Sequence, residues 1–389
     1  MHPDIKNVFV AIALVTISSF NLQAGTLEPT SPPAPSMYTL EEIYQKVSFL
    51  GPAQTLSATT TAILAGYYNS TSLDVIDADL VASNIRSGVV IFGITGTYIG
   101  DSTTNQPPPA PAGMSLIPAG EFVMGDTFGE GGSDELPLHT NTISAFYMDK
   151  YEVTKALWEE VKAFTGSYGY TYSNTGLGKA TNHPVHTVNW FDVVKWCNAR
   201  SQRDGLAPVY YTDAGFTTVY KTGEIAPFAN WSANGYRLPT EAEWEKAARG
   251  GLAAQRFPWG DTISHSNANY YAYLSGYSYD VNPTEGYHPI FNIGNQPYTS
   301  PVGYFAPNGY GLYDMSGNVW EWCWDWYSSS YYSSSPSTDP RGPSSGSYRV
   351  LRGGSWIVTA YVTRVAIRDY YYLPDVESYA IGFRCARGL

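Results

Sequence analysis

The sequence predicts a loop-dominated fold with few helices, organised around one large core. From Gly113 onward, short apolar stretches are interrupted by Gly, Asn, Pro and Asp, which end regular elements after a few residues. Hydrophobic residues make up 43% of the 389 residues and charged residues only 14%, a composition that supports a substantial core and excludes a disordered chain.

Three segments carry the start signals of helices. Thr154, Asn189 and Thr240 each precede a segment that is typical of a helix, and their side chains can cap its amino terminus. Thr240 and Glu243 form a T-x-x-E capping box, and Gly250 stands where that helix can end. We therefore expect three helices within an otherwise irregular fold.

The amino-terminal part is predicted to contain targeting and linker segments. An apolar run over residues 8–20 follows Lys6 and precedes small residues, which is typical of a secretory signal peptide. The run is shorter than the roughly 20 residues that cross a bilayer, so no transmembrane segment is expected. The predicted organisation is a signal peptide (1–24), a Pro-rich linker (25–37), a small accessory module (38–100), a second Pro-rich linker (101–112) and one large domain (113–389).

Charge and cysteine content exclude several function classes. The chain has 22 Lys and Arg against 34 Asp and Glu, a formal net charge of -12, which repels phosphate backbones. Nucleic acid is therefore not an expected partner. Three cysteines without C-x-x-C spacing exclude the common zinc modules.

Eight motifs occur in order within residues 113–389: GMSLIPAGEFVMGD, FYMDKYEVT, HPVHTVNWFDVVKWC, YRLPTEAEWEKAARGG, FPWGD, NGYGLYDMSGNVWEW, RVLRGGSW and GFRCAR. In these motifs the region resembles the formylglycine-generating enzyme, or sulfatase-modifying factor, family. The resemblance implies an α+β fold of the C-type-lectin type, rich in irregular structure around a small antiparallel sheet. Enzymes of this family oxidise a sulfatase cysteine to formylglycine with a cysteine pair that holds copper.

The resemblance also shows what this chain lacks. The two places that hold the family's catalytic cysteines are occupied by Val358 and Thr363. Copper binding and thiol exchange both need sulfur, so we expect neither copper nor oxidase activity. The family's bridging cysteines match Cys197 and Cys385, which implies a disulfide, and Cys323 is expected to be a small buried hydrophobic residue.

The resemblance further implies structural calcium. Asp314 and Glu321 match side-chain ligands of the family, and Gly317 and Val319 match its carbonyl ligands; oxygen donors of this kind suit calcium. A turn in which Asp314 and Asn318 bond backbone amides is the alternative. A second calcium set maps to Asn269 and Tyr270, with Glu285 and Tyr287 as replacements for its remaining ligands.

Residues 356–381 are predicted to form the ligand-binding region. Many of its residues can arise from an asparagine codon when only adenines are replaced, and the segment resembles the variable region of proteins diversified by retroelements that carry a reverse transcriptase. Ordinary strands are the alternative, since Val, Ile, Thr and Tyr dominate strands too. The expected ligand-binding residues, rich in tyrosines suited to binding, are Trp356, Ile357, Val358, Thr359, Tyr361, Thr363, Ile367, Asp369, Tyr370, Tyr371, Tyr372, Ser378 and Tyr379.

These observations predict an exported, calcium-stabilised and catalytically silent protein, periplasmic, secreted or on the cell surface. It would bind a protein or cell-surface ligand through its carboxy-terminal face. Two alternatives remain open: a formylglycine-generating oxidase with another sulfur pair, and a structural surface protein or adhesin with a fixed ligand.

Overall fold

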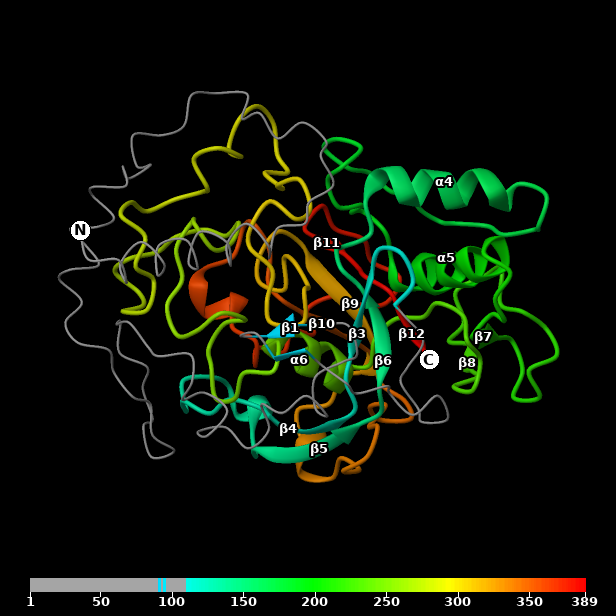
Figure 1. The fold of residues 1–389 in the computed structure, drawn as a ribbon. Helices are drawn as coiled ribbons and strands as arrows, with labels where there is room; N and C mark the ends of the chain where they lie inside the picture. The colour runs from blue at the N-terminus through cyan, green and yellow to red at the C-terminus, as the bar shows by residue number, and fades with distance from the viewer. Residues whose placement is uncertain (1–89, 92–93, 96–109) are drawn as a thin grey trace, which may run out of the picture. The chain divides into compact units, whose positions relative to one another are not determined.

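The computed structural model describes residues 90–91, 94–95 and 110–389 (Figure 1). The chain divides into two units, residues 1–105 and 106–389. The predicted signal peptide, both Pro-rich linkers apart from residues 110–112, and most of the accessory module lie outside the described residues. In the first unit, β1 (Val90–Ile91) and β2 (Ile94–Thr95) form an antiparallel pair.

The first two predicted helices are present with their predicted caps. α4 (Lys155–Thr165) begins after Thr154, whose hydroxyl accepts a hydrogen bond from the third residue beyond it. α5 (Trp190–Arg203) begins after Asn189, whose side chain does the same. α4 buries only one face, whereas α5 is buried along most of its length. α5 is therefore an interior helix, covered on one side by α4.

The third helix, α6 (Glu241–Arg249), has the predicted capping box. Thr240 accepts a hydrogen bond from the amide of Glu243, and the Glu243 carboxylate accepts one from the amide of Thr240. Gly250 ends the helix with a φ of 58°, a left-handed conformation that glycine adopts without strain. Local sequence therefore determines both ends of α6.

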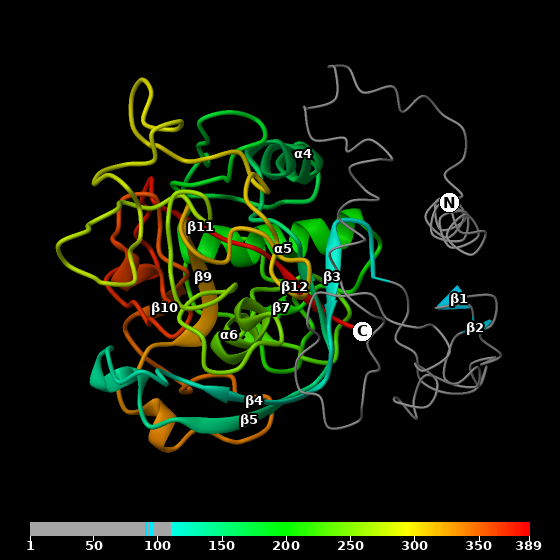
Figure 2. The ribbon, with the colours of Figure 1, turned by 60° about the vertical axis from the view of Figure 1, so that its left-hand side comes forward.

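The second unit contains two small sheets, built mostly from strands near its amino-terminal end in sequence. β3 (Met114–Ile117) and β12 (Ala386–Gly388) pair antiparallel with either side of β6 (Phe146–Asp149), so the first and last described strands of the unit lie in one sheet. β4 (Gly120–Met124) and β5 (His139–Ile143) form a long antiparallel ribbon that Figure 2 shows along one edge of the unit.

A central sheet carries the carboxy-terminal segment. β9 (Trp320–Trp326) lies between β10 (Arg349–Arg352), which is antiparallel to it, and β11 (Ile381–Gly382), which is parallel. β7 (Tyr210–Tyr211) and β8 (Phe228–Ala229) form a separate short pair. The short 3-10 helices are η2 (Ser133–Glu135), η3 (Tyr331–Ser333) and η4 (Ala360–Thr363). This mixture of three helices, short strands and long loops matches the expected α+β fold.

Aromatic side chains fill the core between the helices and the central sheet. Trp158 of α4 and Trp196 of α5 stack with ring centroids 5.8 Å apart, and Phe383 packs edge-on against both rings. All three side chains are fully buried. Buried aromatic rings of this size supply much of the apolar area that stabilises a domain. The core therefore joins α4 and α5 to the last residues of the chain.

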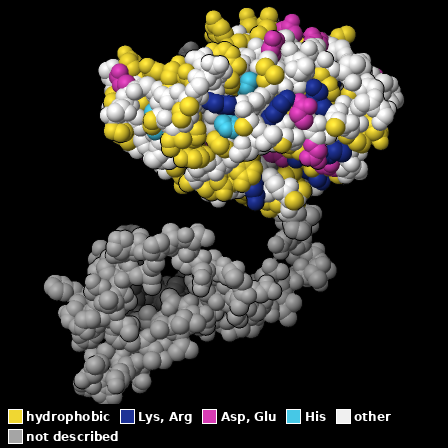
Figure 3. Space-filling view, turned by 90° about the horizontal axis from the view of Figure 1, so that it is seen from above, with side chains coloured by type: hydrophobic (Ala, Val, Ile, Leu, Met, Phe, Trp, Pro, Cys, Tyr) yellow, Lys and Arg dark blue, Asp and Glu magenta, His cyan; other side chains and the backbone are white. Residues whose placement is uncertain are grey.

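Charge is unevenly distributed over the second unit. In Figure 1, α4 and α5 lie on one side of β9, and the loops of residues 250–300 lie on the other. Figure 3 shows that most of the charged side chains visible from above gather over the helical side, while the loop side is mainly apolar or uncharged. Among the described residues, no helix has the length and apolar character needed to span a membrane.

Candidate ligand-binding face

One strand holds both ends of the predicted variable region. The chain leaves β10 at one edge of β9 and returns as β11 at the other edge, so residues 353–380 connect the two edges. Asp369 in this connection exchanges backbone hydrogen bonds of 2.9 and 3.1 Å with Leu351 of β10. The segment is irregular, but its ends and one interior point are fixed by backbone pairing.

Arg352 fixes the middle of the segment from inside. Its guanidinium donates to the carbonyls of Val365 and Ala366 at 2.9 Å and forms a buried ion pair with Glu245 of α6. Arg352 is fully buried. Because its hydrogen bonds reach backbone carbonyls, they do not depend on which side chains the segment carries.

Arg364 and Arg368 attach the same segment to distant parts of the chain. Arg364 pairs with Glu135 of η2 through two nitrogen–oxygen contacts of 2.9 and 2.8 Å. Arg368 pairs with Glu241 of α6 through contacts of 2.6 and 2.8 Å. All four residues are buried. Paired contacts between guanidinium and carboxylate define geometry closely, so these residues orient the backbone.

The structure turns most of the predicted ligand-binding residues toward solvent. Tyr371 is 82% exposed, Tyr370 47% and Tyr379 43%. Other predicted residues are partly exposed. We call these outward residues the variable face; its members are Ile357, Val358, Thr359, Tyr361, Asp369, Tyr370, Tyr371, Tyr372, Ser378 and Tyr379.

Three of the predicted ligand-binding residues lie in the interior and cannot touch a ligand in this conformation. Trp356 and Thr363 are fully buried, and Ile367 is only 9% exposed. The Trp356 ring packs against Tyr298 at 5.2 Å, and the Thr363 hydroxyl donates to the carbonyl of Ala360 at 3.0 Å. The expectation that these three residues bind the ligand is therefore corrected: packing holds their side chains in the interior.

Tyrosines outside the variable region extend the face. Tyr327, in the Tyr- and Ser-rich stretch 326–340, stacks on Tyr370 with ring centroids 3.9 Å apart. Tyr348 approaches Tyr370 edge-on at 6.1 Å. The rings of Tyr348 and Tyr370 border an open depression of about 690 Å³. We call it the tyrosine pocket; its lining residues are Tyr348, Arg368, Asp369, Tyr370 and Tyr371.

A second flank comes from the loop after residue 270. The Tyr277 ring stacks on Tyr361 with centroids 5.7 Å apart, and the amide of Tyr271 donates to the carbonyl of Val358 at 2.9 Å. Tyr273 in the same loop is 43% exposed. The variable face is therefore bordered on two sides by tyrosine-rich loops.

No sulfur lies at the places of the family's catalytic cysteines. Val358 is partly exposed and Thr363 is buried. All three cysteines of the chain lie elsewhere and are buried free thiols. The Sγ atoms of Cys197 and Cys385 are 3.7 Å apart, so the predicted pair is adjacent but not bonded here. Burial raises the pKa of Cys323 well above its usual value, which opposes formation of a reactive thiolate.

The first predicted calcium set lies in a buried turn rich in carboxylates. Asp314 is 8% exposed, Glu321 1%, and Glu152 beside them 1%. Arg384 pairs with Glu321 at 2.6 Å. Burial raises the pKa of Asp314 to about 6, and burial together with the charges of Asp314 and Glu321 raises the pKa of Glu152 well above its usual value. A bound cation would offset this excess of buried negative charge.

The predicted calcium turn contains one buried carboxylate oxygen without a hydrogen-bond partner. Asp314 Oδ2 accepts a hydrogen bond from an amide at 2.6 Å, but the buried Oδ1 has no hydrogen-bond partner. Asn318 Oδ1 also accepts one from an amide, at 2.9 Å, as the turn interpretation expects. Among the described residues, no three His, Cys, Asp or Glu side chains form a metal site. Calcium would thus need the carbonyls of Gly317 and Val319, and carbonyls are common calcium ligands.

The second predicted calcium set is not assembled in this structure. The carbonyl of Tyr270 lies 3.1 Å from His265 Nε2, and the Asn269 side chain donates to the carbonyl of Tyr298 at 2.8 Å. Glu285 is exposed and accepts a hydrogen bond from Ser275. The Tyr270 carbonyl and the Asn269 side-chain amide therefore already have hydrogen-bond partners, and the exposed Glu285 carboxylate interacts with Ser275 instead.

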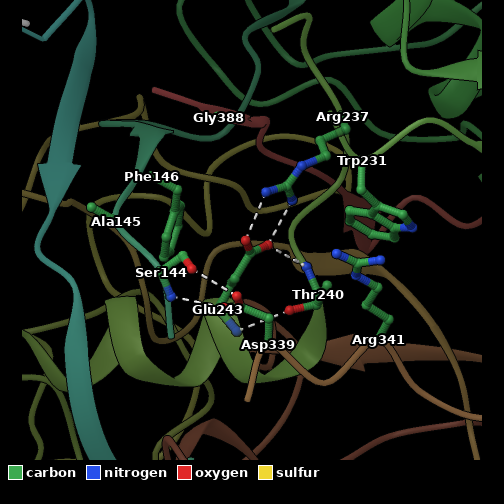
Figure 4. A pocket seen from close by; sticks show the side chains of 10 residues that line it. All are labelled: Ser144, Ala145, Phe146, Trp231, Arg237, Thr240, Glu243, Asp339, Arg341 and Gly388. Carbon is green, nitrogen blue, oxygen red and sulfur yellow. Dashed lines mark hydrogen bonds and ion pairs between the residues drawn. The ribbon is translucent and has the colours of Figure 1, made fainter. Parts of the chain in front are cut away.

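Another depression, of about 240 Å³, lies outside the variable face (Figure 4). Arg237 and Glu243 pair there at 2.6 and 2.7 Å, and Asp339 accepts two hydrogen bonds of 2.7 Å. Arg341 lies over the Trp231 ring at 4.4 Å. Both acidic groups already have partners. Arg341 is therefore the main charged group with which this depression could contact a ligand.

Sequence reasoning missed the partners of the residues it identified. Glu135 and Glu152 were not singled out, although Glu135 pairs with Arg364 and Glu152 accepts a hydrogen bond from Asn318 in the interior. Glu135 is 229 residues from Arg364, and no local pattern reports such a distance. Glu152 lies within the FYMDKYEVT motif, where a carboxylate among apolar residues was a usable signal.

Comparisons with known proteins agree with the architecture. The family model described as "Sulfatase-modifying factor enzyme 1-like domain" matches residues 101–389. The formylglycine-generating enzyme of Streptomyces coelicolor is 37% identical over 299 residues, covering 72% of this chain and 90% of that protein. The corresponding Bos taurus enzyme is 34% identical, with 72% and 75% covered.

Solved structures connect the fold to a variable protein. Treponema denticola variable protein 1 has a TM-score of 0.54 and 30% identity, covering 71% of this chain and 95% of that one. CarF has a TM-score of 0.54 and 28% identity, with 72% and 99% covered. The likeness to a variable protein agrees with the resemblance of the carboxy-terminal segment to a diversified region. The chain belongs to the sulfatase-modifying factor enzyme 1-like domain family.

Proposed function

We propose that this protein is an exported, catalytically silent family member that binds a protein or cell-surface ligand through the variable face. One observation carries the proposal: the segment presents tyrosines outward while buried arginines anchor its backbone. Tyr370, Tyr371 and Tyr379 present large amphipathic rings with few rotatable bonds, a property that antibody loops use for binding. Thr359 and Ser378 add hydrogen-bonding groups that can adapt to different ligands.

The absence of sulfur at positions 358 and 363 supports catalytic silence. An oxidase would need two accessible thiols, whereas the three cysteines of this chain are buried. Incubation with copper and a sulfatase-type peptide, followed by mass spectrometry, should show no loss of the peptide's cysteine sulfur. Turnover of the peptide would establish the oxidase alternative.

We further propose that the Asp314 turn binds calcium and that Cys197 and Cys385 form a disulfide after export. The unpartnered Asp314 Oδ1 and the buried carboxylates favour the ion. The adjacent sulfurs favour the bridge, which an oxidising compartment would allow. In the chain-entropy model a loop of this length gains up to about 4–5 kcal/mol from such a bridge.

The test of ligand binding compares the protein with the double variant Tyr370→Ala/Tyr371→Ala. Both rings are exposed, so the variant should keep its melting temperature and lose binding to cells or surfaces that retain the parent protein. The matched control is Tyr168→Ala, because Tyr168 is 44% exposed on another part of the unit. Unchanged binding by the double variant would place the ligand site elsewhere.

Diversification is tested in genomic DNA. A neighbouring reverse-transcriptase gene, and a repeat that differs from the codons of residues 356–381 only at template adenines, would support a variable ligand. Without that repeat, a surface protein with a fixed ligand becomes the better interpretation of the same face.

A further inference from the structure

The tyrosine pocket contains a carboxylate without a cationic partner. Asp369 Oδ1 accepts a hydrogen bond from the amide of Tyr371 at 2.8 Å. In the described part of the chain, no Lys or Arg forms an ion pair with Asp369. Arg368 lines the same pocket, but Glu241 binds its guanidinium through two contacts. The positive charge of Arg368 is therefore already balanced within the core.

A second carboxylate lies beside the same rings. Asp134 Oδ2 accepts a hydrogen bond from the hydroxyl of Tyr327 at 2.8 Å, and the Tyr327 ring stacks on Tyr370. The hydrogen bond from Arg368 to Asp134, of 2.9 Å, reaches the backbone carbonyl and not the carboxylate. Burial, followed by the charge of Asp134, raises the pKa of Asp369, although two backbone amides oppose this shift. Two carboxylates therefore lie in or beside the pocket, and neither forms an ion pair with a Lys or Arg among the described residues.

Aromatic rings complete the environment. Tyr348 and Tyr370 meet nearly at right angles, with an interplanar angle of 69°, and Tyr371 is 82% exposed at the rim. A cation near aromatic faces is attracted by their quadrupole, and a nearby carboxylate adds direct charge attraction. The volume, about 690 Å³, lies within the range of about 300–1,000 Å³ typical of small-molecule sites. The pocket can therefore hold a side chain together with adjoining backbone.

We infer that the tyrosine pocket binds a basic side chain, arginine or lysine, presented by the protein ligand. This inference rests on the proposed binding function and gives the chemistry of one part of that surface. Asp369, Tyr370 and Tyr371 are within the variable region, whereas Asp134, Tyr327 and Tyr348 are outside it. The preference for a cation therefore belongs to this particular sequence, since a different set at 369–371 would change the charge of the pocket.

The probes for the test are two short peptides, Gly-Ser-Arg-Ser-Gly and the same peptide with citrulline, a neutral arginine analogue of nearly equal shape. Titration calorimetry on the full chain should show saturable binding of the arginine peptide. The citrulline peptide should bind at least about fivefold more weakly than the arginine peptide. No saturable arginine binding, or equal affinity for both peptides, would overturn the inference.

Asp369→Asn locates the effect. The asparagine oxygen can still accept the hydrogen bond from Tyr371, so the backbone should be preserved, and affinity for the arginine peptide should fall roughly fivefold to fiftyfold. Asp375→Asn is the matched control, because Asp375 is exposed on the same segment and does not line the pocket. Equal effects of the two variants would also overturn the inference.

The two proposals fail separately. If Tyr370→Ala/Tyr371→Ala loses surface binding while arginine and citrulline peptides behave alike, the binding function stands and the cation preference is wrong. If the arginine peptide binds through Asp369 but the double tyrosine variant keeps its surface binding, the pocket is a cation site and the proposed ligand face is wrong.

Discussion

Replacing Arg364 by methionine tests whether buried ion pairs anchor the variable region. The side chains of Arg364 and Glu135 are 2% and 1% exposed, and Asp126 lies 3.7 Å from the same guanidinium. Without the arginine, two buried carboxylates lose their cationic partner. Removal of one member of a buried pair typically costs about 3–5 kcal/mol. For a domain of this size we expect the melting temperature to fall by about 6–15 °C.

Urea unfolding followed by tryptophan fluorescence measures this cost. Arg203→Met is the matched control, because the pair of Arg203 with Glu160 is also close, at 2.9 Å, but its side chains are 22% and 68% exposed. That variant should lose less than about 1 kcal/mol. The double variant Arg364→Met/Glu135→Gln removes both charges and should regain part of the loss. Equal costs for the two single arginine variants would refute the reasoning.

Three further predictions concern the interior. Gly317→Ala should lower the free energy of unfolding by about 2–4 kcal/mol. Gly317 has a φ of 82°, and a Cβ there would lie 2.3 Å from the Asn269 carbonyl oxygen. A loss below about 1 kcal/mol in urea unfolding would contradict this. EGTA should lower the melting temperature if calcium binds at Asp314, and an unchanged curve without calcium in elemental analysis would remove the ion. Burial lowers the pKa of His183 and His186 from 6.5 to about 4, so the unfolded chain binds more protons between these values. Stability should therefore fall as pH decreases through that window, and less steeply in His186→Gln, as thermal melts at several pH values would show.

Features set by neighbouring residues were predictable from sequence. The caps at Thr154, Asn189 and Thr240 and the left-handed end at Gly250 were all confirmed. Each depends on a hydrogen bond or a backbone angle within one helical turn, so the necessary information is local. The short length of the strands was also predictable, because frequent glycine and proline residues end them.

Features set by distant contacts were not predictable in the same way. Arg364 and Arg368 pair with Glu135 and Glu241, and nothing in the sequence near either arginine indicates these partners. The interior positions of Trp356 and Thr363 depend likewise on loops that fold over them. Alternation of apolar and polar residues predicts which side chains point inward only in a regular strand. Residues 353–380 contain almost no regular strand.

The contacts along residues 353–380 are compatible with the proposed variation of this segment. Arg352 bonds to backbone carbonyls, and the ends pair with β9, so most of the stabilising contacts do not involve the outward side chains. Substitution of an exposed residue such as Tyr371 typically changes stability by about 0.5 kcal/mol or less. Substitution of the buried Thr363 would disturb η4, because its hydroxyl binds the Ala360 carbonyl. The outward positions can therefore be substituted without loss of the fold, as the proposed function requires, whereas the inward positions of the same segment are restricted by packing.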